Sequence, residues 1–561
     1  MAGRSRYPFA AAAGVAAVVL GAGVGELTAA VGASASSPFA AIGGTLIDAA
    51  PPWAKDAAIG LFGTGDKAAL LTGIAIALLV AAAVAGMLEA RFPPTGRVIC
   101  VLLGVVGVVA AVHRPDADSL AWAPSAAAGV LAALAIGPLV RLAGASVPPA
   151  PAPEAPAAGA PAAEASAAGG PAAEAPGVEG RYPGGTVPAT PVAPPPAPMA
   201  PAQRSTSRRG FFAWTATAAL VGIAAAAVGT AMQSGSRAAT AIRRAVHLPR
   251  PVNAVAVPAS ASFAVPGLSP VITPNAEFYR IDTALVVPQV DPDTWKLRIH
   301  GLVDREVTLT WPQLLALPLR ESAATLSCVS NDVGGDLIST AIWLGYPVRD
   351  LLAQAGVHPD ADMVLSTSVD GFTASTPLET LTDPRREAIL AVGMNGQPLP
   401  PEHGFPVRMV VPGLYGYLSA TKWVVDLNVT RFADATAYWT QRGWAPRGPI
   451  KLESRIDVPR DGGRVAAGRT VIAGVAWHPH TSIGGVQVQI DHGPWQHAQL
   501  ATAVSADTWV QWRLPWNATA GSHTIRCRAV DADGTVQTGT VAPPAPDGAT
   551  GWHSVQVTVG A

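Results

Sequence analysis

The sequence of 561 residues is 50% hydrophobic and only 13% charged, and it carries a formal net charge of −1. Its length predicts several domains, and the near-neutral charge gives no reason to expect a nucleic-acid partner. Three scattered cysteines do not make a disulfide framework. Cys100 lies in an apolar run and Cys527 in a strand-like run, so we predict that both are packing residues, whereas Cys328 lies in a polar, glycine-rich stretch.

The N-terminal region, residues 1–145, predicts an all-α transmembrane bundle of about four helices. The apolar runs long enough to cross a bilayer lie at about 8–30, 68–89, 97–113, 120–140 and, set apart from the others, 211–232. A shorter apolar run at 39–50 predicts an interfacial or re-entrant segment. Because no histidine lies deep in any run, a haem with paired axial histidines is not expected.

Positive residues beside these runs predict their orientation, because short cytoplasmic loops are enriched in Lys and Arg. The residues that would face the cytoplasm are Arg4, Arg6, Arg91, Arg97, Arg141, Arg204, Arg208 and Arg209, and the exceptions are Lys55, Lys67 and Arg114. Five spans from a cytoplasmic N-terminus place everything after residue 235 outside the cytoplasm, which predicts a multi-pass protein of the cell membrane. Glu26 lies inside the first run and is either a functional carboxyl or a residue of the outer interface.

Three stretches of the remaining chain carry concentrated polar chemistry. Cys328 stands in the sequence Ser-Cys-Val-Ser-Asn, and a thiolate is a strong, soft metal ligand; the alternative is a buried structural cysteine. The second stretch, 391–423, holds His403 and Arg408 five residues apart. Arginine offers a planar fork that suits phosphate oxygens. The third stretch is 273–283.

Together these stretches resemble the sulfite oxidase family of molybdopterin enzymes, over roughly residues 265–561. The resemblance implies that Cys328 ligates the metal of a molybdenum–molybdopterin cofactor. The residues that it implies for binding the cofactor are Asn275, Tyr279, Arg280, Asp282, Thr283, Asp370, His403, Arg408, Ser419, Thr421 and Lys422. His403 and Arg408 match the pair that holds the pterin phosphate and ring, and 419–422 match the phosphate loop. That loop is one residue longer here, which leaves open which of its residues takes which role.

The resemblance also implies the fold of the exported part. It implies a mixed α+β, sulfite-oxidase-like molybdopterin domain over 250–445, then an immunoglobulin-like β-sandwich over 450–561 that often supports dimerisation, so a homodimer is one expected partner. The hydrophobic patterns agree with short strands separated by Gly and Asp turns. Strands are predicted at 295–301, 363–368, 407–411, 470–477, 485–490, 509–514 and 523–530, and short helices at 314–317 and 349–355.

Departures from the family pattern concern the substrate. Sulfite-oxidising relatives have an Arg four or five residues after the Cys, where this chain has Asp332 and a valine. A carboxylate there would repel sulfite. Trp444 stands where the family usually has a Tyr near the metal, which makes it a candidate catalytic residue beside Cys328. The substrate-reaching Arg of the C-terminal domain is also missing, and His478 and His480 are the candidate cationic replacements.

The expected activity is that of an oxidoreductase that transfers an oxygen atom on a small-molecule substrate in the manner of sulfite oxidase. One alternative is a reductase for sulfoxides, such as methionine sulfoxide, on the same cofactor. The alternative from another class is a cofactor-free domain for binding or sensing. Because no haem or iron–sulfur ligand set is visible, electrons are expected to pass through a separate partner, which would be a cytochrome, a quinone or another membrane subunit.

The segment between the membrane region and the C-terminal part of the chain predicts how that part crosses the membrane. Residues 146–206 are rich in Pro and Ala and predict a disordered linker. Residues 207–212 open a predicted signal-anchor helix over 207–235 and resemble a twin-arginine signal in an internal position. Because family members take up their pterin in the cytoplasm, the domain is expected to cross already folded. No cleavage site is evident, so the helix is expected to stay as an anchor.

Overall fold

The computed structural model describes residues 7–32, 36–50, 66–114, 117, 119–145, 208–234 and 242–560. The predicted linker at 146–206 lies outside the described residues, as do Arg4, Arg6 and Lys55. The side chains of Lys67, Arg208 and Arg209 also lie outside the described part, so the twin-arginine motif stays a prediction.

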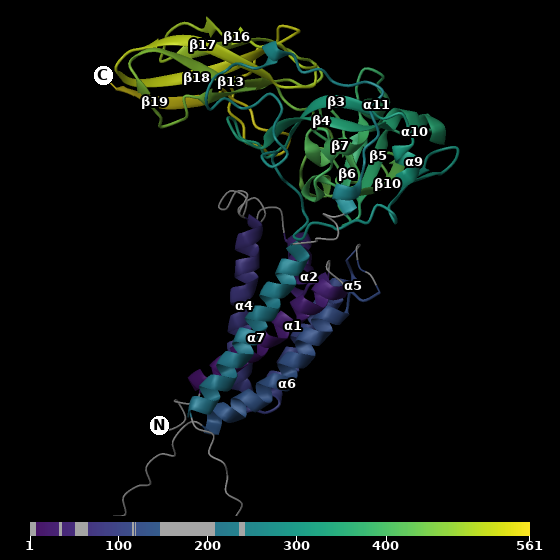
Figure 1. Cartoon of the computed structure of the whole chain (residues 1–561), viewed down its shortest axis with the longest axis vertical. Helices are drawn as coiled ribbons and strands as arrows, with labels where there is room; N and C mark the ends of the chain where they lie inside the picture. Colours follow the sequence, from purple (N-terminus) through teal and green to yellow (C-terminus); the bar gives the residue numbers. More distant parts are fainter. Residues whose placement is uncertain are drawn as a thin grey trace, which may run out of the picture.

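The N-terminal helices form a bundle of roughly parallel rods (Figure 1). They are α1 (Tyr7–Gly32), α2 (Pro38–Ala49), α4 (Asp66–Arg91), α5 (Thr95–Val112), α6 (Ala123–Ala145) and α7 (Arg208–Ser234). Five of the described helices are long and apolar enough to cross a membrane, which agrees with the five predicted runs. Helix α2 has 12 residues and is too short to span, as the run at 39–50 predicted. Helix α1 is central, because it packs against α4, α6 and α7.

One end of the bundle lies near the β-rich domains and the other end is remote from them. The beginning of α1, the α4–α5 connection, the end of α6 and the beginning of α7 lie at the end remote from the β-rich domains, while α7 runs toward those domains (Figure 1). Arg91, Arg97 and Arg141 therefore share the remote end. Of these, Arg97 forms an ion pair with the buried Glu89 at 3.0 Å.

Glu26 supports the junction between α1 and α2. It is buried, and its Oε1 accepts a hydrogen bond from Ser37 Oγ at 2.8 Å. Ser37 Oγ in turn accepts from the amide of Ala40 at 3.3 Å and so caps the beginning of α2. The carboxyl therefore has a structural role at the end of the bundle that faces the β-rich domains.

Glycines let α1 and α7 approach closely, as is common where helices pack in a bilayer. A Cβ on Gly222 would lie 2.6 Å from the carbonyl carbon of Val19 and 2.7 Å from the Cα of Leu20. Gly222→Leu is therefore expected to destabilise the bundle by about 1–3 kcal/mol, measured by thermal unfolding of the full chain in detergent. The matched control is Gly73→Leu in α4, whose Cβ would meet no atom within 4 Å. Equal losses in the two variants would contradict this packing.

The central domain, residues 242–450, is built on one mixed and one antiparallel sheet. The strands of its first sheet, in spatial order, are β2 (Val307–Thr310), β1 (Lys296–Gly301), β10 (Val424–Thr430), β5 (Met363–Ser368) and β6 (Thr373–Pro377). Those of its second sheet are β3 (Arg320–Ser327), β4 (Ile338–Pro347), β7 (Ile389–Met394) and β8 (Gln397–Pro398), with β9 (Arg408–Val410) paired to β7. The short helices are α9 (Trp311–Leu315), α10 (Val348–Ala355), α11 (Leu378–Thr382), α12 (Gly416–Ser419), η4 (Pro401–His403) and η5 (Thr440–Arg442).

Local sequence explains these elements. In β1 buried and exposed residues alternate, as predicted for 295–301. Helix α9 begins with a capping box in which Thr310 and Gln313 satisfy each other's backbone amides. Strands β5 and β9 occupy the predicted runs at 363–368 and 407–411. The predicted mixed α+β character of the domain is confirmed.

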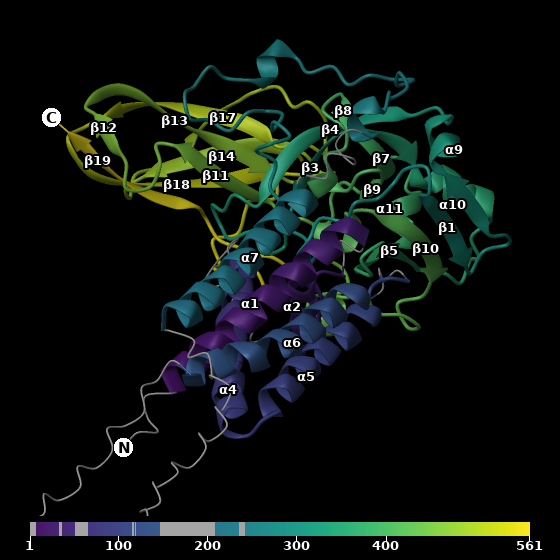
Figure 2. The ribbon, with the colours of Figure 1, turned by 60° about the horizontal axis from the view of Figure 1, so that its bottom comes forward.

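The C-terminal region, residues 451–560, has two further sheets that pack face to face (Figure 2). One contains β11 (Glu453–Val458), β13 (Gly468–Trp477), β17 (Val510–Ala518) and β16 (Gln499–Leu500). The other contains β12 (Arg464–Ala466), β19 (Ser554–Gly560), β18 (Gly521–Asp531), β14 (Ile483–Ile490) and β15 (Gln496–His497). Their shared core includes Trp512 from the first sheet and Cys527 from the second, so Cys527 is a packing residue as predicted. The two-layer β architecture agrees with a sandwich, and its immunoglobulin-like character stays a prediction.

The C-terminal region docks on the strand that leads to Cys328. The amide of Thr325 in β3 donates to Asp507 O at 2.9 Å, and Trp509 N donates to Thr325 Oγ1 at 2.8 Å. Trp509 Nε1 also donates to Val271 O at 2.8 Å. Thr325, Asp507 and Trp509 are all buried, so these bonds are shielded from water. The C-terminal region thereby holds the end of β3 in place.

Candidate active site

Cys328 directly follows β3 and begins a tight loop that leads into β4. Cys328 N donates to Leu337 O at 2.9 Å, and the buried Asn331 side chain accepts from Leu337 N at 2.8 Å. The thiol is half-buried. Burial raises the pKa of Cys328, while hydrogen bonds from Ser330 and from the amide of Val329 act to lower it. The loop thus holds the sulfur in place with donors directed at it.

His403, Arg408 and Lys422 come together in one buried group, here called the cationic group. Their exposed fractions are 2%, 3% and 9%. Arg408 donates to the backbone carbonyls of His403 at 3.1 Å and Ala420 at 3.4 Å. Lys422 Nζ donates to Asp282 Oδ2 at 2.9 Å. The three residues come from η4, β9 and the turn before β10, and the fold brings them to one place.

Burial controls the protonation of the cationic group. It lowers the pKa of Arg408 to about 10 and the pKa of Lys422 to about 8. Burial, then Arg408 and Lys422, lower the pKa of His403 to about 3, so its imidazole is neutral at physiological pH. The group therefore holds two positive charges and one neutral imidazole.

Asp282 supplies negative charge to this group. Its carboxylate also accepts from the half-exposed Arg280 at 2.9 Å, so one carboxylate is shared by two cations. Thr283 follows it in the same loop and is half-buried. Arg280 and Asp282 thus lie beside Lys422, as the resemblance implied for residues of one cofactor site.

Tyr279 connects the cationic group with the thiol. Burial and then Cys328 raise the pKa of Tyr279, and Arg408 lowers it, so its hydroxyl lies within electrostatic range of both. In the same loop the backbone carbonyl of Asn275 lies 3.2 Å from His403 Nε2. The structure therefore brings the first predicted stretch, the thiol and the cationic group together.

The loop at 419–422 uses its hydroxyls within the protein. Ser419 Oγ donates to the backbone carbonyl of Tyr415 at 3.0 Å, and Thr421 Oγ1 lies 2.7 Å from Ser366 Oγ. Within the described part of the chain, the amides of Thr421 and Lys422 donate to no hydrogen-bond partner. The amides and the ammonium, rather than the hydroxyls, are thus the groups that the loop offers to an anion.

Asp370 lies in the turn between β5 and β6. Its Oδ1 accepts from Phe372 N at 3.3 Å, and Val369 N donates to Trp423 O at 3.0 Å. This second bond places the turn beside the residue that follows Lys422. The buried Ser368 Oγ, at the end of β5, has no hydrogen-bond partner among the described residues.

The residues present fit a buried anionic ligand. Arg408 donates only to backbone carbonyls in the described part of the chain, so hydrogen bonds to a carboxylate do not offset its charge. The buried His403 Nδ1 also lacks a hydrogen-bond partner there. A buried cation that lacks a carboxylate hydrogen-bond partner and an unpaired buried nitrogen are both costly, and a phosphate with polar ring groups satisfies both.

Trp444 packs on an apolar cluster beside the thiol loop. It is half-buried, with its ring centroid 6.0 Å from that of Tyr417 and 6.4 Å from that of Trp439. All three belong to or pack on an apolar cluster that includes Val329, next to Cys328. The structure therefore places Trp444 in the neighbourhood of the thiol loop, where it presents an apolar surface.

The two candidate histidines of the C-terminal region are engaged elsewhere. His478 Nδ1 lies 3.1 Å from Asp531 Oδ2, and His480 lies 3.5 Å from Asp383 and 3.4 Å from Asp507. Because each imidazole faces carboxylates, neither offers an unpaired cation to a substrate.

Sequence reasoning missed two residues beside the thiol loop. Arg455 of β11 donates from Nη1 to Gly335 O at 2.7 Å and from Nε to Asp457 Oδ1 at 2.7 Å, so the C-terminal region holds the loop. Glu453, in the same strand, is buried, and its Oε1 has no hydrogen-bond partner among the described residues. No local signal marks either residue, because the thiol loop that they lie beside is more than 100 positions away in the sequence.

Glu453 predicts a pH-dependent stability. Burial, and then Asp332, raise its pKa to about 8, while Lys451 lowers it. The folded chain therefore binds an extra proton between about pH 4.5 and 8, and its stability falls as the pH rises through this window. Glu453→Gln is expected to be more stable than wild type by about 2–4 kcal/mol at pH 8.5 and equal to it at pH 4.5 or below, measured by thermal unfolding. The control is the exposed Glu306→Gln, and a pH-independent effect of Glu453→Gln would contradict the assignment.

Comparisons with known proteins agree with this geometry. Residues 284–439 match the family described as the oxidoreductase molybdopterin binding domain. Mitochondrial sulfite oxidase of Homo sapiens is 34% identical over 325 residues, which cover 48% of this chain and 58% of that protein. Sulfite oxidase of Gallus gallus is 31% identical over 326 residues, which cover 48% of this chain and 69% of that protein.

The chain belongs to the sulfite oxidase family of molybdopterin oxidoreductases. This membership accounts for the joint order of the three predicted stretches. The chain spans 58% of the length of the rat and human sulfite oxidases. The sulfane dehydrogenase SoxCD from Paracoccus pantotrophus has a structure 24% identical in sequence, with a TM-score of 0.46, over 52% of this chain and 82% of that one.

Proposed function

We propose that this sulfite oxidase family member is a membrane-anchored molybdenum enzyme that transfers an oxygen atom outside the cytoplasm. The observation that carries the proposal is the buried cationic group with the unpaired His403 Nδ1 close to Cys328. A domain for binding or sensing without a cofactor has no use for buried charges of this kind, which cost stability when unmatched.

The cofactor would be held by residues from both sides of the site. Cys328 would ligate the molybdenum, Arg408 and Lys422 would neutralise the pterin phosphate, and the imidazole of His403 would contact the pterin. Asp370 would accept from pterin N–H groups, as the family resemblance implies. The bound cofactor supplies the redox chemistry and the metal to which an oxygen atom is attached.

The protein's own contribution is orientation and exclusion of water. The tight loop from Cys328 to Leu337, fixed by Asn331 and from outside by Arg455, would hold the sulfur against displacement. The phenol of Tyr279 would stay protonated, because burial and the nearby thiol raise its pKa, so it would act as a hydrogen-bond donor toward the site.

A sulfoxide reductase on the same cofactor is the second candidate, and two substitutions favour it. Asp332, exposed in the loop that follows Cys328, places a negative charge where sulfite-oxidising relatives have an arginine. Trp444 and its aromatic neighbours offer an apolar surface. A carboxylate and an indole suit a neutral substrate such as methionine sulfoxide better than a sulfite dianion.

The helices support the proposed location. Arg91, Arg97 and Arg141 share the end of the bundle remote from the central domain, as expected if that end faces the cytoplasm. Export of the folded domain by the twin-arginine signal at 207–212, with α7 kept as an anchor, would follow. Electrons would then pass to a separate partner, namely a cytochrome, a quinone or another membrane subunit, and the C-terminal region would support a homodimer.

The experiment is metal and pterin analysis of the exported full chain, followed by assays in both directions. About one molybdenum and one pterin per chain are expected, by mass spectrometry and pterin fluorescence. Folded, exported protein with neither would overturn the proposal. Sulfite oxidation with an artificial acceptor and methionine sulfoxide reduction with an artificial donor then decide between the two candidate reactions.

A further inference from the structure

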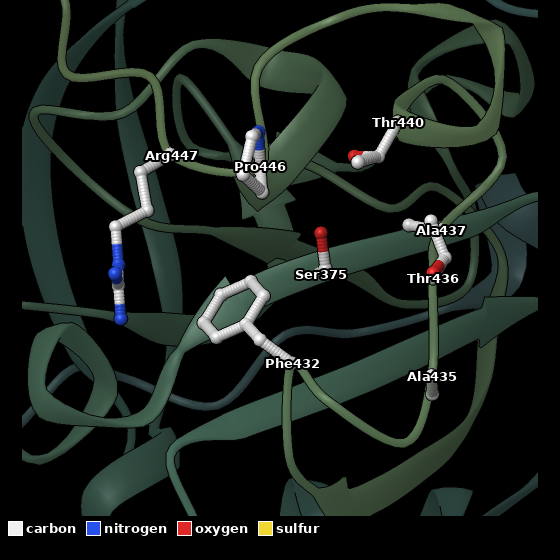
Figure 3. A pocket seen from close by; sticks show the side chains of 8 residues that line it. All are labelled: Ser375, Phe432, Ala435, Thr436, Ala437, Thr440, Pro446 and Arg447. Atoms are coloured by element: carbon white, nitrogen blue, oxygen red, sulfur yellow. The ribbon is translucent and has the colours of Figure 1, made fainter.

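A pocket lies in the central domain between β6 and the segment 432–447, and Figure 3 shows it from close by. Its volume is about 270 Å³, whereas roughly 10–15 Å³ suffices for one water. Apolar walls come from Phe432, Ala435, Ala437 and Pro446. The pocket is therefore large enough for an organic molecule of several heavy atoms.

Polar groups with unmet bonding capacity point into this pocket. Ser375 is 1% exposed, its Oγ has no hydrogen-bond partner among the described residues, and the hydroxyl points to the middle of the pocket in Figure 3. The buried Thr440 Oγ1 is also without a partner there and points to the same space. Leaving buried hydroxyls unsatisfied is unfavourable, so two such groups facing one cavity indicate a ligand that bonds them.

A positive charge lies at the same pocket. The guanidinium carbon of Arg447 lies 4.9 Å from the centroid of the Phe432 ring, and no ion pair of Arg447 occurs in the described part of the chain. Arg431, directly before this segment, does have carboxylate partners, because it pairs with Asp360 and Asp434. The charge of Arg447 is thus available to an anion.

The pocket is separate from the candidate cofactor site. Segment 432–447 carries Trp439 and Trp444, whose rings pack on the apolar cluster that contains Val329, beside Cys328. Ala437, Thr440 and Pro446 of the same segment line the pocket instead. The segment therefore has one face toward the thiol loop and another toward the pocket.

We infer that this pocket binds a small organic carboxylate. Its carboxylate oxygens would be bonded by Arg447 and by the hydroxyls of Ser375 and Thr440, and its short apolar body would lie against Phe432 and Pro446. The apolar walls favour an organic acid over a bare inorganic oxyanion, because they contribute only when apolar surface is buried. The inference concerns binding alone and does not depend on the proposed oxygen-atom transfer.

The test measures binding of butyrate to the full chain in detergent by saturation-transfer difference NMR, with sulfate as the competitor. Wild type is expected to bind butyrate, and Arg447→Gln and the double variant Ser375→Ala with Thr440→Val are each expected to bind it at least about 10-fold more weakly. The matched control is Arg442→Gln. Arg442 lies in the same segment and also stacks on a ring, that of Tyr438, but does not line the pocket.

Three results would overturn the inference. They are absence of butyrate binding to wild type, equal loss of binding in Arg442→Gln and Arg447→Gln, and displacement by sulfate at the same concentration as by a second organic acid such as valerate. The serine and threonine changes remove hydroxyls that have no hydrogen-bond partner among the described residues, so these variants are expected to fold. Circular dichroism of each variant separates loss of binding from loss of fold.

Discussion

Replacing Cys328 by serine is expected to lower turnover per chain by at least about 100-fold while pterin content stays near that of wild type. Turnover falls while pterin content is kept, because the proposed phosphate contacts lie in the cationic group and not in the loop of Cys328. A serine oxygen is a harder, more basic donor than a thiolate, so the metal would lose the soft ligand that adjusts its redox potential. Turnover, molybdenum content and pterin fluorescence are measured on the same preparation.

The matched control for this substitution is Cys527→Ser in the C-terminal core. Cys527 is fully buried in the core of the C-terminal region and accepts a hydrogen bond from Ser454 Oγ at 3.3 Å, so its replacement affects that core and removes no proposed metal ligand. It is expected to lower thermal stability and leave turnover per molybdenum unchanged. Wild-type turnover per molybdenum in Cys328→Ser would exclude Cys328 as the ligand.

Arg408→Met is expected to change the stability of the cofactor-free protein little and to weaken retention of the cofactor strongly. In cofactor-free protein, produced in a host that makes no pterin, its free energy of unfolding is expected to stay within about 1 kcal/mol of wild type. Removing a buried charge that burial itself disfavours, as the lowered pKa of about 10 indicates, offsets the lost bonds to backbone carbonyls. With pterin supplied, retention of the cofactor is expected to fall at least about 10-fold.

Urea unfolding of both forms and pterin fluorescence after dialysis measure these effects. The control is Arg431→Met, an arginine that pairs with Asp360 and Asp434 and is 39% exposed in its side chain. It is expected to retain pterin as wild type does. If Arg408→Met destabilises the cofactor-free protein by several kcal/mol and retains pterin, Arg408 has a structural role and the anion site lies elsewhere.

The sequence alone determined those features whose physical cause is local. The five spans are readable because about twenty consecutive apolar residues are rare outside membrane-spanning helices, and α1, α4, α5, α6 and α7 occupy the predicted runs. Strands such as β1 and β18 follow from alternation over a few residues. The site could be predicted because His403, Arg408 and Lys422 lie within twenty positions of one another, in an order that the family shares.

Only the tertiary structure decided which polar side chains form hydrogen bonds within the protein and which are left without a partner. Ser419 and Thr421 matched the family's phosphate loop, yet their hydroxyls bond within the protein, while His403 Nδ1 and Ser368 Oγ are left without partners among the described residues. Whether a polar atom is satisfied depends on what packs against it in space, which local sequence does not encode.

The same reason explains the contributions from distant segments. Arg455 and Asp507 reach the thiol loop and its strand from more than 100 positions away, and the pocket joins Ser375 to Arg447 across 72 positions of sequence. Composition and periodicity indicate on which face of its own helix or strand a residue lies. They do not indicate which residue of another sheet it will contact. The burial of Glu453 was therefore decided by how the C-terminal region packs on the central domain, and the pocket by how segment 432–447 packs on β6.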